Sequence, residues 1–205
     1  MTPPVTTTRL PAAERRQALV DAAMRVFMAR SYRGATTADI AREAGVSEPI
    51  LYRHFPSKRD LYFACLDRAW GGLRELWEEA IAANPDQPFS AMARCYFDLK
   101  ERKLLLAELW IQAVTEAAED PEIRRRLRGH MREVHRFVAG TIRGAQERGG
   151  IVRDRDPEAE AWIFVAMGLL ATVGRRVGTL LDEDDFARIR ASRVEWMTGA
   201  PPREP

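Results

Sequence analysis

The sequence predicts an all-α fold, with a three-helix unit at the N-terminus and a larger helical domain after it. Three observations support this prediction. Apolar residues recur every three or four positions, the period of one helix face, along most of the 205 residues. The helix start signal Asp-Pro-Glu occurs at 120–122 and again at 156–158. The sequence has no strand-like alternation, no internal repeat and no glycine-rich phosphate loop.

Composition and charge narrow the possible partners. Apolar residues make up 46% of the chain and charged residues 30%, which is typical of a globular protein with a buried core. The net charge is only +2, but residues 1–60 hold ten Lys/Arg against six Asp/Glu. This local excess favours a polyanionic partner for the N-terminal unit. Cys65 and Cys95 lie inside helical patterns without metal-ligand spacing, so we expect buried free thiols.

The first predicted helix covers residues 12–30. Its apolar residues fall at i, i+3, i+4, i+7 and i+8, namely Leu19, Ala22, Ala23, Val26 and Phe27. This spacing gives one apolar stripe, which is suited to cover two following helices. Residues 31–34 interrupt the pattern, and residues 1–10 are expected to form a flexible tail.

Two short helices are predicted between residues 36 and 58. Thr36 suits the N-cap of the first, and Gly45 ends it where a positive φ is wanted. Ser47 can cap the second helix, with Pro49 in its first turn, where a missing N–H costs little. Two short helices joined by a tight glycine turn form a helix-turn-helix.

The second of these helices has more side chains than packing requires. Leu51 and Phe55 point back toward Ile40, which completes the core of the motif. The remaining positions are Glu48, Pro49, Ile50, Tyr52, Arg53 and His54. Such a face is what a recognition helix presents to the DNA major groove, although a helical hairpin with a solvated outer face is the alternative.

At these residues the sequence resembles the TetR family of transcriptional regulators. The resemblance covers roughly residues 15–62 and rests on Thr36-Thr37, Ile40-Ala41, Ala44-Gly45-Val46, Leu51-Tyr52-Arg53-His54-Phe55 and Lys58. It implies a cytoplasmic homodimer that binds a palindromic double-stranded DNA operator, with a helical ligand-binding and dimerisation domain after the DNA-binding domain.

Residue chemistry suggests how the motif would contact the DNA backbone. The hydroxyls of Thr37 and Ser47 suit phosphates, and so does Lys58 at the start of a helix. Tyr52 and His54 match family positions that usually touch the backbone. The predicted DNA-binding set is Thr36, Thr37, Ser47, Glu48, Pro49, Ile50, Tyr52, Arg53, His54 and Lys58.

Four members of this set face the groove in the prediction. Arg53 could read guanine, and Ile50 a thymine methyl group. Glu48 either reads a cytosine amino group or points away, and Pro49 lies beside it.

The predicted domains are residues 11–57 for the helix-turn-helix and 58–198 for the larger domain, with tails at 1–10 and 199–205. A long helix from 58 to about 82 starts the second domain and would couple the two mechanically. Further helices are expected at 89–100, 104–118, 121–148, 157–179 and 183–197.

The helix at 157–179 is apolar nearly all round, so it must be buried on more than one side. Part of that cover is expected from a second subunit. The resemblance implies pairing through the last two long helices, and the candidate interface residues are Trp162, Phe164, Met167 and Phe186.

The resemblance also places an inducer cavity among the middle helices. The candidate ligand-binding residues are Trp77, Met92, Phe97, Trp110 and Phe137, and plain core packing is the alternative for each. A small hydrophobic or aromatic inducer is expected. The predicted function is a ligand-responsive repressor, without enzymatic activity, cofactor, metal or membrane partner. The alternative is an all-α small-molecule binding protein or enzyme whose helix-turn-helix serves only protein contacts.

Overall fold

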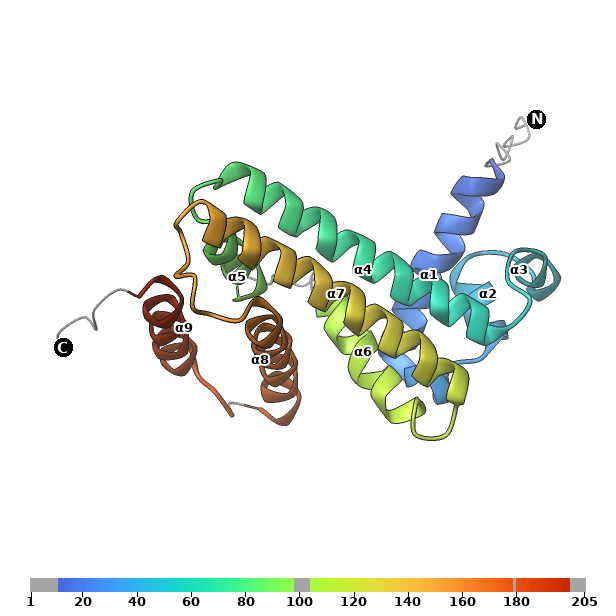
Figure 1. The fold of residues 1–205 in the computed structure, drawn as a ribbon. Helices are drawn as coiled ribbons and strands as arrows, with labels where there is room; N and C mark the ends of the chain where they lie inside the picture. Colours follow the sequence, from blue (N-terminus) through green and yellow to red (C-terminus); the bar gives the residue numbers. More distant parts are fainter. Residues whose placement is uncertain (1–10, 98–103, 179, 200–205) are drawn as a thin grey trace, which may run out of the picture. The chain divides into compact units, whose positions relative to one another are not determined.

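The computed structural model describes residues 11–97, 104–178 and 180–199, and all regular structure within these ranges is helical (Figure 1). The helices are α1 (Ala12–Gly34), α2 (Thr37–Glu43), α3 (Glu48–His54), α4 (Lys58–Ala83), α5 (Pro88–Phe97), α6 (Leu104–Glu116), α7 (Pro121–Glu147), α8 (Pro157–Val177) and α9 (Glu183–Thr198). The prediction of an all-α fold is confirmed. The predicted tails lie outside the described residues apart from Gly199, as does the side chain of Phe97. Among the described helices, none is long and apolar enough to cross a bilayer.

The chain divides into two compact units, residues 1–68 and 69–205. The division falls inside α4, whereas the sequence predicted a boundary at the start of that helix. The first turns of α4 therefore belong to the N-terminal unit. Just past the division, α4 carries two adjacent glycines, Gly71 and Gly72, and neither has a neighbour where a Cβ would stand.

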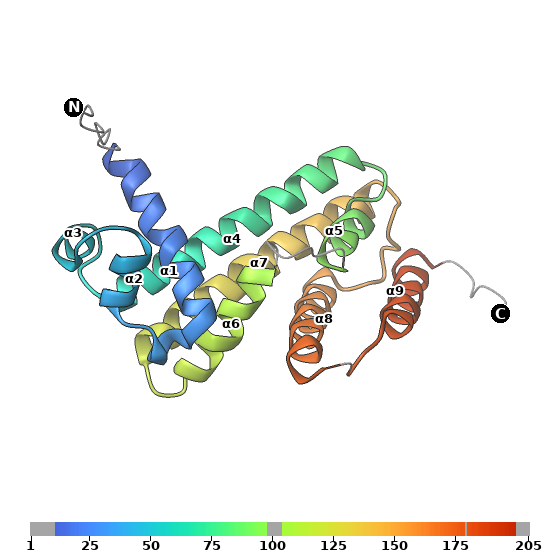
Figure 2. The same cartoon turned by 180° about the vertical axis from the view of Figure 1, so that it is seen from behind.

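In the N-terminal unit α1 lies against α2, and α2 lies against α3 (Figures 1 and 2). The predicted stripe of α1 is buried from Leu19 to Phe27. The predicted break is a kink within α1, because Ser31 adopts φ +63° inside an otherwise helical segment. Below it Phe27 meets Tyr62 of α4 edge-on, with ring centroids 5.1 Å apart. This packing holds the start of α4 to α1.

In the second unit the long helix α7 packs against α8, α6 and α5. One side of α7 is buried along its length, from Ile123 to Ala145. Its start is capped as predicted, since Asp120 accepts hydrogen bonds from the N–H groups of Glu122 (2.8 Å) and Ile123 (3.1 Å). Asp156 caps α8 in the same way.

An aromatic cluster fills the centre of the second unit. Trp77 is stacked on Phe137 at 5.7 Å and meets Trp70 and Phe164 edge-on at 6.0 and 5.6 Å. Phe164 in turn contacts Phe89 at 5.6 Å. Trp77, at the centre of these ring contacts, is 1% exposed, so the cluster is part of the core of the second unit.

The two cysteines differ from each other. Cys65 is buried, as predicted, and burial together with the carboxylates of Asp21 and Asp67 raises the pKa of its thiol. Cys95 is only half-buried, so the prediction of a buried thiol is wrong at that position. Its neighbour on α5, Arg94, is exposed.

Candidate nucleic-acid interface and the predicted ligand and dimer residues

The start of α2 is closed by a reciprocal cap. The N–H of Asp39 donates to Thr36 Oγ1 at 3.1 Å, and the N–H of Thr36 donates to Asp39 Oδ2 at 3.3 Å. The Thr36 hydroxyl also donates to the carboxylate, at 2.8 Å. These bonds from Thr36, with the nearby Arg30 and Arg42, hold the pKa of Asp39 below its usual value. Thr36 thus orders the motif, and its contact with DNA stays a prediction.

The turn between the helices has the predicted geometry. Gly45 takes φ +66°, where a side chain would be strained. The N–H of Val46 then donates to the carbonyl of Ala41 at 2.9 Å. Ser47 is the N-cap residue of α3, but its side chain makes no capping hydrogen bond. Its exposed hydroxyl is not used in that cap, which suits the predicted phosphate contact.

The inner face of α3 is closed as predicted. Ile40 and Leu51 are fully buried, and Phe55 is 2% exposed. The guanidinium of Arg16 lies over the Phe55 ring at 4.6 Å, which ties α1 to the end of α3. No sequence signal pointed to that contact, because it joins residues far apart in the chain.

The residues of α3 predicted to contact DNA differ in their exposure. Pro49, Tyr52 and Arg53 are exposed, whereas Glu48, Ile50 and His54 are half-buried. The hydroxyls of Tyr52 and Thr37 lie 3.1 Å apart, so a side chain of α2 is joined to one of α3. The structure therefore brings together Thr37 and Tyr52, two of the predicted DNA-backbone contacts.

Lys58 is held differently from the prediction. Its ammonium donates to the carbonyls of Tyr32 at 2.9 Å and Ala35 at 3.1 Å, and it lies over the Tyr32 ring at 4.5 Å. Two of the three N–H groups therefore fix the start of α4 to the end of α1. A phosphate contact by Lys58 remains a prediction and would use the remaining N–H.

Two ion pairs connect α1 with α2. Arg25 pairs with Glu43 at 2.7 Å, and Arg30 pairs with Asp39 at 2.9 Å. Both arginines and Glu43 are exposed, whereas the Asp39 side chain is 12% exposed, and the main effect of the pairs is to orient the helices. Both acidic partners are already counted in the charge balance of residues 1–60, so the pairs leave the net positive excess of the unit unchanged.

The predicted ligand-binding residues lie mainly in the core of the second unit. Trp77 is 1% exposed, Trp110 5% and Met92 fully buried, and Phe137 is stacked on Trp77. None of these four lines either of two cavities that lie between α5 and α9. The indole N–H groups of Trp77 and Trp110 are buried without a hydrogen-bond partner. Their role as ligand contacts stays a prediction.

The predicted dimer residues fall on different sides of α8 and α9. Trp162 is 45% exposed and stacks on His135, with centroids 4.2 Å apart. Phe164 joins the aromatic core, and Met167 lines a cavity. Phe186 is half-buried. The exposed apolar side chains of this region that the prediction missed are Ile163, Leu170, Val173, Val177, Leu180, Val194 and Trp196.

Comparison with protein families matches both parts of the chain. Residues 19–65 match the model of bacterial regulatory proteins of the tetR family. Residues 85–193, more than half of the chain, match the model of the C-terminal region of BetI-type transcriptional repressors.

Relatives among known proteins are regulators of the helix-turn-helix type. The transcriptional activator FasR of Mycolicibacterium smegmatis is 42% identical over 95 residues, which are 45% of this chain and 43% of FasR. The regulator BetI of Rhizobium meliloti is 36% identical over 115 residues, 55% of this chain and 57% of BetI. The chain thus matches about half the length of both. The repressor BepR of Brucella suis is 26% identical over 166 residues, 78% of this chain and 79% of BepR.

Solved structures share the fold. A Rhodococcus sp. protein assigned to the TetR family superposes with a TM-score of 0.80 at 22% identity, over 90% of this chain and 99% of that one. A transcriptional regulator from Saccharomonospora viridis, solved in complex with choline, superposes with a TM-score of 0.70 at 22% identity, over 89% and 94%. With the two family matches, these findings show that the chain belongs to the tetR family of bacterial regulatory proteins.

Proposed function

We propose that this protein is a transcriptional repressor that binds a palindromic operator as a homodimer and leaves it when a small apolar inducer binds. The observation that carries the proposal is the two-sided construction of α3. Leu51 and Phe55 close its inner face, while Pro49, Tyr52 and Arg53 stand exposed on the outer face. A short helix so fixed, with a polar exposed side, suits the major groove.

The names of similar proteins support repression of transcription, although they include one activator. The matched C-terminal model describes repressors, and BepR is named as one, whereas FasR is named an activator. The match with BepR covers 78% of this chain and the repressor model covers residues 85–193, whereas the match with FasR covers 45%. We therefore assign repression. A reporter gene placed behind the operator tests whether the protein lowers or raises transcription.

The proposed dimer surface consists of the exposed apolar side chains of α8 and α9. Ile163, Leu170 and Val177 are spaced seven residues apart, so they share one side of α8. All three are more than a third exposed. A contiguous apolar face of this kind is rare on a monomer and marks an interaction surface. A second copy would pair two recognition helices and match a two-fold symmetric site.

The proposed inducer is small and apolar. The two cavities between α5 and α9 lie in the second unit, and the S. viridis neighbour holds choline, which supports ligand binding in this fold. An inducer lowers DNA affinity only if it binds one arrangement of the dimer better than the other. A coupling of about 1–3 kcal/mol would be typical.

The experiment that tests the proposal is a DNA titration by fluorescence anisotropy. The probe is the duplex upstream of the protein's own gene, and random duplex is the comparison. Arg53→Ala should weaken specific binding by about 1–3 kcal/mol and relax preference at one base pair, because a bidentate contact to guanine is lost.

Arg74→Ala is the matched control, because Arg74 is exposed on α4 and paired with Glu78 outside the N-terminal unit. It should leave DNA affinity unchanged. Equal losses on specific and random duplex for Arg53→Ala would reassign Arg53 to the backbone. Absence of any sequence-selective, salt-dependent binding by the wild type would contradict the proposal and favour a role in protein contacts.

A further inference from the structure

The solvent-facing side of α7 carries a row of arginines. The helix contains seven arginines, three glutamates and no lysine. Arg128, Arg132 and Arg136 are spaced four residues apart, so they share one side of the helix, and all three are exposed. At a rise of 1.5 Å per residue, their attachment points are about 6 Å apart. These three residues are called the α7 arginine row here.

The arginines on either side of the row already have partners. Arg124 donates hydrogen bonds to two carbonyls just past the end of α6, at 2.8 Å each. Arg125 pairs with Glu122 at 3.3 Å, and Arg143 pairs with Glu158. The positive charge of these neighbours is therefore used within the second unit.

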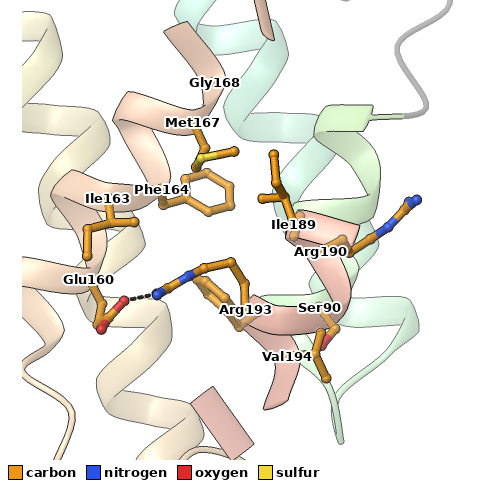
Figure 3. A pocket seen from close by; sticks show the side chains of 12 residues that line it. Ser90, Glu160, Ile163, Phe164, Met167, Gly168, Ile189, Arg190, Arg193 and Val194 are labelled. Atoms are coloured by element: carbon orange, nitrogen blue, oxygen red, sulfur yellow. Dashed lines mark hydrogen bonds and ion pairs between the residues drawn. The ribbon is translucent and has the colours of Figure 1, made fainter. Parts of the chain in front are cut away.

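The row differs from arginines on other helices of the unit as well. Arg193 of α9 donates to the buried carboxylate of Glu160 (Figure 3), and Arg176 of α8 pairs with Glu108. By contrast, no carboxylate of the described residues forms an ion pair with a member of the α7 arginine row. All three guanidinium groups are thus available to a partner.

The positive charge of the row is not compensated by the acid next to it in the sequence. The hydrogen bond and the charge of Glu78 raise the pKa of Arg74, and the charge of Glu133 adds to that effect, so Glu133 interacts with α4. Like charges four residues apart on a helix repel each other and destabilise it. An anionic partner would remove this repulsion.

The surface around the row indicates which kind of anion it suits. Among the described residues, no exposed large apolar side chain lies on α7. The centre of a protein interface is usually apolar, and a helix that binds a membrane surface has Trp, Phe or Leu opposite its basic face. A surface with positive charge alone suits the phosphate backbone of a nucleic acid, which guanidinium groups bind bidentately.

We propose that the α7 arginine row binds the phosphate backbone of duplex DNA without sequence preference. It is a second DNA-binding surface, because it lies in the second unit and the helix-turn-helix lies in the first. Phosphate contacts raise the affinity for every duplex, carry no direct sequence information and weaken with salt. The proposal therefore does not rest on the proposed repressor function.

The test is an anisotropy titration of the full-length protein with a random-sequence DNA duplex at 50 to 200 mM salt. The row variant combines Arg128→Gln, Arg132→Gln and Arg136→Gln. Each phosphate contact that is lost should make the slope of log affinity against log salt less steep by about 0.9. If all three are lost, the ratio of wild-type to variant affinity should be about 40-fold larger at 50 mM than at 200 mM salt.

The control variant removes the same charge from other exposed positions of the second unit, through Arg74→Gln, Arg153→Gln and Arg188→Gln. It should keep the wild-type slope, although its net charge equals that of the row variant. Lysine at all three row positions should also keep the slope, because the charges remain. A slope of the row variant within about 0.9 of the control slope would overturn the proposal.

Thermal unfolding and two other anions test the premises. The row variant should unfold at or above the wild-type temperature, because repulsion is relieved. A lower temperature would show that the row stabilises the fold and would overturn the proposal. So would binding to phosphatidylserine vesicles or to polyglutamate that the row variant loses while its DNA slope stays unchanged, which would assign the row to a membrane or to an acidic protein.

The duplex upstream of the protein's own gene separates this inference from the proposed function. A wild-type slope in the row variant beside intact sequence-selective binding would overturn the row and leave the repressor assignment standing. A row-dependent slope on random duplex without any sequence-selective binding would support the row and contradict the repressor assignment.

Discussion

The outer faces of α3 and α8 differ in chemistry although both helices lie on a closed core. On α3 the exposed side chains include Tyr52 and Arg53, whereas on α8 they are Trp162, Ile163 and Leu170, among others. Among the described residues, the exposed large apolar side chains lie between 162 and 196, apart from Tyr52 and Val114. The difference indicates that the two units are suited to different kinds of binding partner. A polar face suits the wet, charged groove of DNA, and an apolar face suits another protein surface.

The largest effect is expected from removing the support beneath α3. Phe55→Ala should destabilise the N-terminal unit by about 3–5 kcal/mol, because a buried ring is lost and a cavity is left. Operator binding should vanish while the dimer persists. Chemical denaturation and sedimentation measure both. Loss of the dimer as well would show that the two faces do not act independently.

A somewhat smaller effect is expected from placing a charge on the exposed apolar face of α8. Leu170→Glu places a carboxylate on the exposed apolar side of α8 and should weaken self-association roughly a hundredfold, since burying an unpaired charge is costly. Val114→Glu, at an exposed apolar residue of α6, is the matched control and should leave the dimer intact. Sedimentation velocity over a concentration series is the measurement. Equal weakening by both variants would move the proposed interface away from α8.

The next prediction concerns Lys58, because its ammonium stabilises the N-terminal unit and is also predicted to contact a DNA phosphate. Lys58→Met keeps the apolar stem but loses the hydrogen bonds to Tyr32 and Ala35, which should cost about 2 kcal/mol. DNA affinity should fall alike for all sequences. Thermal unfolding and anisotropy on random duplex test the two effects. Unchanged stability with weaker binding would assign the ammonium to phosphate alone.

The smallest effect concerns the cap of α2. Thr36→Ala should cost about 1 kcal/mol near neutral pH. Because the folded-state pKa of Asp39 is lowered, with the Thr36 hydrogen bond as the first cause, the stabilisation is present above the unfolded-state pKa and is lost as pH falls through the folded-state value. The difference between wild type and variant should therefore shrink in acid. A difference that stays constant with pH would show that the carboxylate is not involved.

Much of the fold could be predicted because its signals are local. The caps at Thr36, Asp120 and Asp156 act on N–H groups two or three residues away, so the helix starts were readable from the sequence. The inner and outer faces of α3 followed from spacing alone.

The remainder depends on contacts between distant residues. Lys58 bonds a carbonyl 26 residues earlier, and Glu160 meets Arg193 33 residues later. Neither partner is implied by helical period. The exposed face of α8 was readable, since Ile163, Leu170 and Val177 recur at a seven-residue spacing. The prediction instead named Trp162, Phe164, Met167 and Phe186.

The paired glycines of α4 have a mechanical consequence. The helix runs for 26 residues through the division between the two units, and Gly71 and Gly72 stand just beyond it. Each glycine weakens a helix interior by about 1 kcal/mol relative to alanine, so bending and transient opening are cheapest at this point. We therefore expect α4 to bend more easily at these two glycines than elsewhere along its length. The substitutions Gly71→Ala and Gly72→Ala should therefore stiffen α4. Among the described helices, α4 is the only one that belongs to both units.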